Sequence, residues 1–167
     1  AERLSRLVDD LLQLSDIETG KLVLKPTLLS LHEVAAEVVA FFEKQAAQKS
    51  LSLVNNVPPD IRLQADWDRL TQIFVNLVDN AVKYTPEHGK ITLGAEYKTP
   101  GFMHVWVVDT GIGIPSIDLP RITERFYRVE GGMASGSGLG LSIARELARL
   151  MNGSVGLESR PGRTVTV

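Results

Sequence analysis

Leucines recur at alternating spacings of three and four along the first twenty residues, at Leu4, Leu7, Leu11 and Leu14. This spacing predicts a helix with one apolar stripe, widened by Val8 and Leu12, of the kind that packs in helix bundles and coiled coils. Charged residues flank the stripe and are expected to form a solvated face: Glu2, Arg3, Arg6, Asp9 and Asp10. Residues 1–20 are therefore either an ordinary amphipathic helix or a bundle helix that packs on another domain or a second chain.

After residue 20, short alternating runs and longer helical patterns follow one another. Strands are predicted by alternation and by the turn residues that bound it, at 21–26, 51–55, 61–65, 91–97, 103–108, 154–159 and 164–167. Helices are predicted at 30–49, 66–84, 119–126 and 139–151, the second with Asp66 as its N-cap. A hairpin turn at 99–101 excludes an all-parallel sheet. The order of elements predicts an α/β fold, a two-layer sandwich in which a mixed sheet packs under about three helices, preceded by one bundle helix.

Composition limits the classes of function. The 167 residues suit one domain with a small appendage. The absence of cysteine excludes disulfides and thiolate metal sites. A net charge of −2 gives no electrostatic reason to expect a nucleic-acid partner. No apolar run approaches the ~20 residues that span a bilayer, so no direct membrane contact is expected. The chain opens in mid-helix and stops on a strand, which indicates a fragment of a longer protein.

The stretch "NLVDNAVKYTP" at 76–86 interrupts an apolar helical pattern with polar residues. On a helix, one face would carry Asn76, Asn80, Lys83 and Tyr84. Amide oxygens are neutral, hard ligands for Mg²⁺, and a nearby lysine can meet phosphate oxygens. Such a face suits a nucleotide–metal complex. The alternative for this helix alone is that its asparagines bond to neighbouring loops.

Two glycine-rich stretches can complete such a site. The first, "DTGIG" at 109–113, follows an apolar strand, and its glycines allow the backbone to approach a ligand while its carboxylate can accept hydrogen bonds from a ligand amino group. The second, "GSGLG" at 136–140, precedes a helix whose N-terminal N–H groups and dipole favour a phosphate. It is not a Walker A loop, because no Lys-Ser/Thr follows. Either stretch alone is a weak signal that occurs in many turns.

Taken together and in this order, the motifs resemble those of the catalytic, ATP-binding domain of a bacterial two-component sensor histidine kinase, in the superfamily shared with gyrase, Hsp90 and MutL. "NLVDNAVKYTP" is similar to the N box, "DTGIGIP" to the G1 box, "ERFYRVE" to the F box and "GSGLGLSIARELARLMNG" to the G2 box. "LPRITERFYRV" is most similar to phosphate-regulon-type sensor kinases. Many relatives have Phe at the position of Thr123, so the phenylalanine contact of the F box is expected from Phe126 or is absent.

The resemblance implies a division of the chain. Residues 1–20 resemble the second helix of a dimerisation and histidine-phosphotransfer hairpin. Residues 21–167 resemble a catalytic domain with a Bergerat-type ATP-binding fold and a mobile lid near 129–138. Within the lid, Met133 is expected either to pack on the nucleotide or to be exposed.

The resemblance also implies ATP and Mg²⁺ as cofactors and gives roles at the phosphates. Asn80 would be the Mg²⁺ ligand, and Asn76 would support the metal or the phosphates. Lys83 and Tyr84 would lie along the triphosphate, and Arg128 would reach the γ-phosphate. The candidate catalytic residues are Asn76, Lys83 and Arg128.

At the base, the resemblance implies that Asp109 receives the adenine amino group. The loop that lets the base sit close would be formed by Gly111, Gly113 and Ile114. The hinge of the lid and the helix start over the phosphates would be formed by Gly136, Ser137, Gly138, Leu139 and Gly140.

One position separates a kinase from a hydrolase. Superfamily ATPases have a glutamate four residues before the metal-binding asparagine, and here that position is Asn76, whose amide is no general base near neutral pH. Asp79 is a rival base, but it lies about 100° round the helix from Asn80 and is expected to face solvent. The resemblance therefore implies transfer to a histidine of the upstream hairpin.

The histidines of the chain are poor candidates for the phosphoacceptor. His32 and Glu33 resemble an acceptor motif, but they follow the bundle helix and are expected in a capping turn. His88 and His104 are expected to be structural or exposed. The acceptor is therefore expected upstream of this chain, and the chain alone should bind Mg-ATP with little or no autophosphorylation.

The partners implied are the protein's own hairpin, a response-regulator receiver domain and a second copy in a homodimeric full-length protein. The location implied is cytoplasmic, in a parent that is either membrane-anchored or soluble. Three alternatives remain open: a nucleotide-binding scaffold without catalysis, a superfamily ATPase, and a serine kinase of the anti-sigma-factor type.

Overall fold

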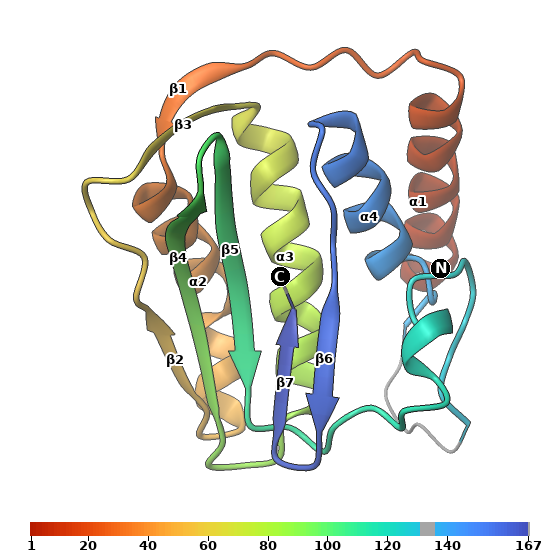
Figure 1. Cartoon of the computed structure of the whole chain (residues 1–167). Coiled ribbons are helices and arrows are strands. Elements are labelled where there is room, and N and C mark those ends of the chain that lie inside the picture. Colours follow the sequence, from red (N-terminus) through yellow and green to blue (C-terminus); the bar gives the residue numbers. More distant parts are fainter. Residues whose placement is uncertain (131–135, 167) are drawn as a thin grey trace.

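The computed structural model describes residues 1–130 and 136–166. It has two layers, a sheet on one side and helices on the other (Figure 1). The main sheet has the strand order β2-β4-β5-β7-β6. The bounds are Ser52–Asn55 for β2, Lys90–Thr99 for β4, Phe102–Asp109 for β5, Leu157–Arg160 for β6 and Arg163–Thr166 for β7. Because β2 runs parallel to β4 and the other neighbours are antiparallel, the predicted mixed sheet is confirmed.

Within the described residues, three helices cover one face of this sheet, and they are α2 (Leu31–Gln48), α3 (Trp67–Tyr84) and α4 (Gly140–Leu150). The middle helix, α3, packs against both of the others. Buried side chains of α3 lie at helical spacing, at Phe74, Leu77, Val78 and Ala81. They belong to one core with the inward-facing strand residues Ile91, Leu93 and Val107. This arrangement confirms the predicted two-layer α/β sandwich.

The starts of α2 and α3 follow from side-chain caps. The Ser30 hydroxyl oxygen accepts the N–H of Glu33 at 3.3 Å, and Asp66 Oδ1 accepts the N–H of Arg69 at 3.2 Å. Each cap satisfies a backbone donor that the helix itself leaves unpaired, and a cap of this kind contributes about 1 kcal/mol. The predicted N-cap at Asp66 is confirmed.

Two predicted elements are wrong. Residues 21–26 form no strand, because no neighbouring strand lies beside them: Val23 is 73% exposed, and the N–H of Lys25 donates to the Asp66 carboxylate. The strand is instead β1 (Thr27–Ser30), which pairs with β3 (Arg62–Ala65) in a small antiparallel ribbon. The helix expected at 119–126 is only a 3₁₀ turn, η1 (Leu119–Arg121), and Phe126 has a φ of 61°.

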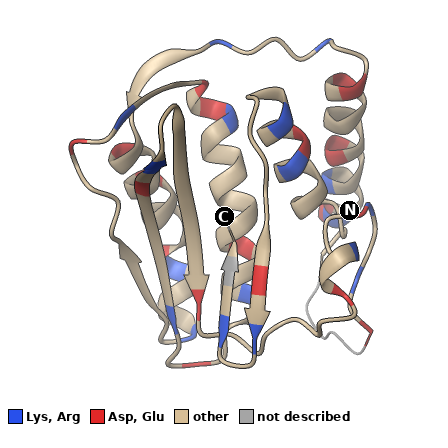
Figure 2. Ribbon diagram, viewed as in Figure 1, with Lys and Arg blue, Asp and Glu red and all other residues tan. Residues whose placement is uncertain are grey.

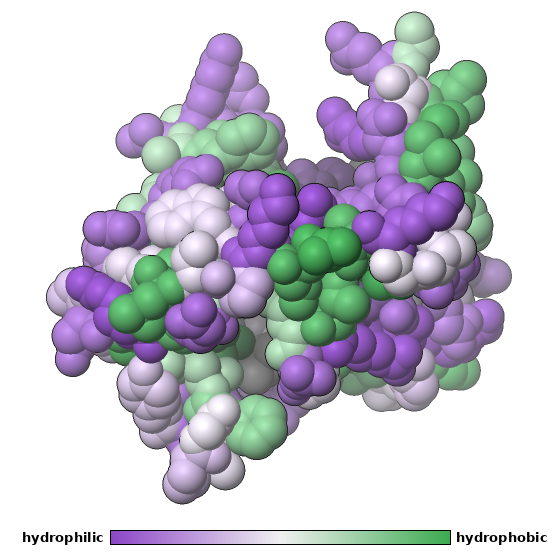
Figure 3. Space-filling view, turned by 90° about the horizontal axis from the view of Figure 1, so that it is seen from above, coloured by the Kyte–Doolittle hydropathy of each residue, from purple (hydrophilic) through white to green (hydrophobic). Residues whose placement is uncertain are grey.

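The first helix, α1 (Glu2–Glu18), lies beside α4 (Figure 1). Leu14 is 1% exposed, and Leu7 and Ile17 pack against the same core. The rest of the apolar stripe faces outward, at Leu4, Val8, Leu11 and Leu12. Figure 3 shows hydrophobic residues on the outer side of this helix, at the right of the view. The stripe is therefore divided, with one edge packed on α4 and the core and the other edge open.

The charges on the described residues are mixed. Figure 2 shows Lys and Arg interspersed with Asp and Glu along the helices. Within residues 1–130 and 136–166, no helix has both the length and the apolar content that crossing a membrane requires.

Candidate functional site

Three segments that are far apart in the sequence meet at one end of the fold. They are the last turns of α3, the loop after β5, and the loop that leads into α4. The N–H of Ile112 donates to the carbonyl of Tyr84 at 3.2 Å, which ties the loop after β5 to the end of α3. A Cβ atom on Gly140 would lie 3.9 Å from Cβ of Asn76, which puts the start of α4 against α3. The predicted N, G1 and G2 boxes are thus brought together.

Asn76 lies on α3 opposite the start of α4. Its Nδ2 atom is buried and has no hydrogen-bond partner within the described structure. An unpaired buried donor of this kind costs about 1–3 kcal/mol, so an acceptor brought by a ligand would relieve that cost. Asn80, one turn later, is half-buried on the same helix. The alternative that loops satisfy these asparagines is therefore not favoured at Asn76 Nδ2.

Lys83 extends the polar face toward the loop before α4. A Cβ atom on Gly136 would lie 3.6 Å from Nζ of Lys83. The same Nζ atom lies 2.7 Å from Oδ2 of Asp79, in a partly exposed ion pair. The sequence predicts that Asp79 faces solvent. In the structure, Asp79 instead pairs with the lysine one turn later. Tyr84 completes this face and is partly exposed.

Asp109 ends β5 and is 7% exposed. Its Oδ1 atom accepts the N–H of Gly111 at 2.8 Å. Burial raises the pKa of the Asp109 carboxyl above its ordinary value, and the hydrogen bond from Gly111 opposes that shift. Within residues 1–130 and 136–166 the hydrogen bond to this carboxylate is made at Oδ1, so Oδ2 can accept from an incoming donor such as an amino group. A buried acceptor of this kind can select a base that carries a donor.

The two glycines of this loop are required by close packing. A Cβ atom on Gly111 would lie 2.5 Å from Oδ1 of Asp109 and 2.8 Å from the carbonyl oxygen of Tyr84. Gly113 has a φ of 81°, and a Cβ atom there would lie 2.8 Å from the carbonyl oxygen of Arg160. The N–H of Ile114 donates to the Ser159 hydroxyl oxygen at 2.7 Å. The loop is therefore held against both α3 and the turn between β6 and β7.

The start of α4 has no side-chain cap, since its N-cap residue is Leu139. The first N–H groups of a helix without a cap point outward and favour an anion. The Ser137 hydroxyl oxygen accepts the N–H of Leu139 at 3.2 Å and donates to Oδ2 of Asp10, also at 3.2 Å. Gly138 has a φ of 76° and packs against the backbone of Phe126, whose N–H donates to the Gly138 carbonyl.

The F-box segment is fixed on α4 by a polar contact. Arg145 donates to the Thr123 hydroxyl oxygen at 3.1 Å, so the position at which many relatives have Phe carries an anchoring hydroxyl here. The Phe126 side chain is half exposed. Arg128 is exposed on the segment that leads toward residue 131. The middle of the expected lid at 129–138, with Met133, lies outside the described residues.

Three residues at the site were not identified from the sequence. Ser159 and Thr164 lie in the hairpin formed by β6 and β7, the closing hairpin, and their hydroxyl oxygens are 2.7 Å apart. Asp10 was predicted on a solvated face, but it is half-buried against Ser137, and burial raises the pKa of its carboxyl. Serine and threonine in a strand give no periodic signal, and a charge on an amphipathic helix is usually solvated. Only the tertiary contacts identify these residues.

No cluster of three or more His, Cys, Asp or Glu side chains that could hold a metal ion occurs in residues 1–130 and 136–166. Amide oxygens are weak ligands by themselves. The polar face of α3 therefore fits Mg²⁺ only when phosphate oxygens complete the coordination.

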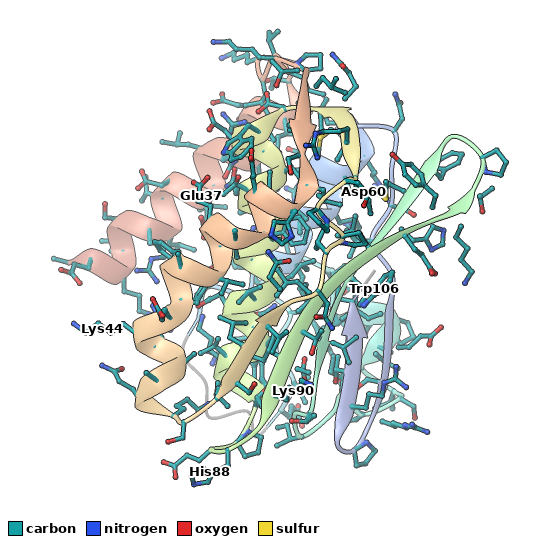
Figure 4. The ribbon with its side chains drawn as sticks, turned by 90° about the vertical axis from the view of Figure 1, so that its left-hand side faces the viewer. Glu37, Lys44, Asp60, His88, Lys90 and Trp106 are labelled. Carbon is teal, nitrogen blue, oxygen red and sulfur yellow. The ribbon has the colours of Figure 1, made fainter. Side chains whose placement is uncertain are left out.

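The three histidines lie in different parts of the fold. His32 Nδ1 donates to the carbonyl of Val57 at 2.6 Å, and its own carbonyl accepts from Asn55. His88 is exposed in the turn before Lys90, at the lower end of β4 in Figure 4, with a φ of 67°. His104 lies on β5, opposite Glu96. The expectation that none of the three is the phosphoacceptor stays a prediction.

The comparisons with known proteins all lead to one family. The family model described as histidine kinase-, DNA gyrase B- and HSP90-like ATPase matches residues 65–167. The adaptive-response sensory kinase SasA of Crocosphaera subtropica (strain ATCC 51142 / BH68) is 37% identical over 162 residues, which cover 96% of this chain and 42% of the relative.

Two solved structures give the same result at the level of the fold. A crystal structure of full-length ShkA in complex with AMPPNP has a TM-score of 0.88 and 30% identity, and the match covers 98% of this chain and 34% of that one. A crystal structure of histidine kinase ThkA in complex with the response regulator protein TrrA has a TM-score of 0.78 and 29% identity, covering 99% of this chain and 46% of that one. The chain spans less than half the length of each of these three proteins.

Proposed function

The chain belongs to the histidine kinase-, DNA gyrase B- and HSP90-like ATPase family, and on that premise we propose that it binds Mg-ATP and donates the γ-phosphate to a histidine, as the catalytic domain of a two-component sensor kinase. The observation that carries the proposal is Asn76: its buried Nδ2 has no hydrogen-bond partner within the described residues, and its side chain lies against the uncapped start of α4 through Cβ, Cγ and Oδ1. A donor without a partner beside a helix N-terminus suits a phosphate oxygen. Asp109, at the far side of the same site, suits an adenine amino group.

The proposed roles follow from these positions. Asn80 ligates Mg²⁺ through its amide oxygen, and the metal neutralises charge on the phosphates. Asn76 donates to a phosphate oxygen, and Lys83 exchanges its partner Asp79 for the triphosphate. Tyr84 lies along the triphosphate, and Arg128 reaches the γ-phosphate.

The remaining roles concern the base and the phosphate cradle. Asp109 accepts from the adenine amino group. The base packs on the loop backbone at Gly111, Gly113 and Ile114. The start of α4 and the loop before it cover the phosphates through Gly136, Ser137, Gly138, Leu139 and Gly140.

Transfer to a histidine is favoured over hydrolysis because the site offers no strong base beside the metal position. Asn76 is an amide, and Asp79 lies about 100° round α3 from Asn80. In the proposed step, the bond between the γ-phosphorus and the β,γ-bridging oxygen breaks and a phosphorus–nitrogen bond forms. The leaving group is ADP, and the imidazole loses its proton to solvent or a base on the acceptor segment.

The acceptor histidine is proposed to lie on another segment of the full-length protein, because Nδ1 of His32 is engaged by the Val57 carbonyl, and His88 and His104 lie in a turn and on a strand instead of on a bundle helix. Residues 1–20 are proposed to be the second helix of a dimerisation and phosphotransfer hairpin. The outward leucines of α1, Leu4 and Leu11, support this assignment, since a two-helix hairpin and a homodimer would cover them. The boundary at residue 20, between this helix and a catalytic domain of residues 21–167, is part of the proposal.

The proposed acceptor of the relayed phosphate is the aspartate of a response-regulator receiver domain. The structural similarity to ThkA, which was solved in complex with the response regulator TrrA, supports this class of partner. Because ATP and receiver domains meet in the cytoplasm, that is the proposed location.

Calorimetric titration with a non-hydrolysable ATP analogue, with and without Mg²⁺ and against GTP, tests the proposal. Binding that prefers adenine and requires Mg²⁺ supports it, and adding a phosphoacceptor hairpin then tests transfer. Binding without transfer would favour a nucleotide-dependent scaffold. Steady release of phosphate without an acceptor would favour an ATPase, and transfer to a serine would favour the serine-kinase alternative.

A further inference from the structure

The loop after β5 is fastened to the turn between β6 and β7 at three places. The N–H of Gly162 donates to the carbonyl of Gly111 at 3.0 Å. The backbone of Gly113 packs against the carbonyl of Arg160 so closely that no side chain fits. At the far end, the N–H of Ile114 donates to the Ser159 hydroxyl oxygen at 2.7 Å. Both ends of the loop are therefore held by the closing hairpin.

Ser159 differs from the other two attachments because it acts through a side chain. Gly162 and Arg160 contribute only backbone groups, which any residue would supply if the turn kept its shape. The Ser159 hydroxyl is a donor and an acceptor, and it is shared with Thr164, whose Oγ1 lies 2.7 Å away on the neighbouring strand. Thr164 is buried and lies opposite Asp109 in the register of β7 and β5.

These contacts connect Ser159 to Asp109 by two routes. One route runs along the loop, from Ile114 through Gly113 to Gly111, whose N–H holds Oδ1 of Asp109 at 2.8 Å. The other route runs across the sheet, from Ser159 to Thr164 and from there to Asp109, which lies opposite Thr164 in the strand register. Ser159 is thus linked both to the loop that carries Gly111 and to the strand that lies beside Asp109.

We propose that Ser159 is a positioning residue for base recognition, and that its hydrogen bond from Ile114 sets the geometry with which Asp109 selects an amino-bearing purine. This inference rests on the proposed function, since it assumes that Asp109 accepts from the adenine amino group. It assigns Ser159 no contact with the nucleotide. Loss of the Ser159 hydroxyl is expected to impair recognition of the base. The phosphate-binding end of the site, which is built by α3 and α4, should keep its geometry.

Ser159→Ala tests the proposal because it removes the acceptor for Ile114 and leaves a strand residue of similar size. Losing one such hydrogen bond is expected to weaken ATP binding about tenfold. The decisive readout is the ratio of the dissociation constants for ATP and inosine triphosphate, which lacks the amino group. Ser159→Ala should reduce that preference severalfold. In a transfer assay with an added phosphoacceptor hairpin, it should raise KM for ATP and leave kcat unchanged.

Two further variants separate positioning from a loss of folding. Ser159→Thr keeps the hydroxyl in a residue suited to a strand and should restore the wild-type preference. Thr166→Val removes a hydroxyl from a buried position on the same hairpin, two residues beyond Thr164, and should bind both nucleotides as the wild type does. Amide exchange at Ile114 should rise in Ser159→Ala alone.

The outcomes distinguish the two levels of the argument. If the wild type binds ATP with a preference over inosine triphosphate and Ser159→Ala loses affinity for both equally, Ser159 is merely structural and the inference is wrong. Unchanged binding by Ser159→Ala also overturns it. If the wild type binds neither nucleotide, the proposed function itself fails and the inference falls with it.

Discussion

Nζ of Lys83 lies 2.7 Å from Oδ2 of Asp79, one helical turn earlier on α3. The lysine proposed to meet the triphosphate thus has a carboxylate partner on its own helix. The pair is partly exposed, and pairs of this kind contribute only about 0.3–0.5 kcal/mol. A triphosphate offers several charges and can displace the carboxylate at small cost. The ion pair therefore orients the lysine without locking it.

Asp79→Asn is expected to keep or raise Mg-ATP affinity, by about twofold, because it removes a competitor of that strength. Transfer to an added hairpin should persist, since Asp79 is not the proposed base. Calorimetry and a transfer assay measure the two effects. Asp68→Asn makes the same change of charge at the exposed first turn of the same helix and serves as control. Loss of transfer with binding intact would make Asp79 the base.

Asn80→Ala is expected to remove the dependence of nucleotide affinity on Mg²⁺. The loss of a ligand in a charged complex corresponds to about 1.5–3 kcal/mol, or roughly ten- to hundredfold in Kd. Because Asn80 is only half-buried, the melting temperature should change little. Titrations with and without Mg²⁺ measure the effect, and the exposed Asn56→Ala is the matched control. A variant that still binds more tightly with Mg²⁺ would mean that the metal ligand lies elsewhere.

Asp109→Asn is expected to stabilise the unliganded protein at neutral pH and to weaken adenine binding. Burial raises the pKa of Asp109 above its ordinary 3.8, so the folded state binds the proton more tightly than the unfolded state. The contribution of this carboxyl to stability therefore falls as the pH rises from about 3.8 through the raised value, and the full cost is present above it. Asparagine keeps an oxygen for the N–H of Gly111 and removes the buried charge.

Thermal unfolding across pH measures this effect. The melting temperature of Asp109→Asn should exceed that of the wild type at pH 7, and the difference should shrink below about pH 4. ATP affinity should fall by roughly tenfold or more, since a hydrogen bond to a charged acceptor is lost. A variant less stable than the wild type at pH 7 would show that the ionised carboxylate is stabilising in place.

The parts of the fold that could be predicted from the sequence rest on local chemistry. Asp66 caps α3 because its side chain reaches a backbone N–H three residues later, and that spacing is visible in the sequence. The strand expected at 21–26 failed because strand formation needs a partner, and the partner of this region, β3, pairs with residues 27–30 instead. Propensity gave no means of telling the two segments apart.

The same distinction between local signals and tertiary contacts applies to the site. Asn76 and Lys83 could be placed on one face from helical spacing alone, whereas Ser159 and Asp10 act through residues 45 and 127 positions away. Such contacts depend on how the closing hairpin and α1 pack. No motif in the sequence encodes them, and they are the parts of the site that required a structure.

Asp10 is the subject of the last prediction. The carboxylate of this α1 residue accepts a hydrogen bond from Ser137, in the loop proposed to cover the phosphates. Two other polar contacts join α1 to the domain: Gln13 and Gln72 exchange amide hydrogen bonds of 2.6 and 2.5 Å, and Glu18 pairs with Arg125. With α1 in this position, a negative charge lies beside the site for a polyanion. Docking of α1 and binding of the triphosphate should therefore oppose each other.

Asp10→Asn removes this charge and keeps an oxygen for Ser137, so it isolates the electrostatic effect. Mg-ATP affinity is expected to rise by about fivefold, which corresponds to ~1 kcal/mol of repulsion between the Asp10 carboxylate and the bound phosphates. Because burial raises the pKa of Asp10, the wild type should approach the variant as the pH falls and the carboxyl takes up its proton. Asp9→Asn makes the same change on the exposed neighbour. Equal gains in the two variants would assign the effect to net charge and not to the contact with Ser137. A loss of affinity in Asp10→Asn would mean that the carboxylate supports the loop that covers the phosphates.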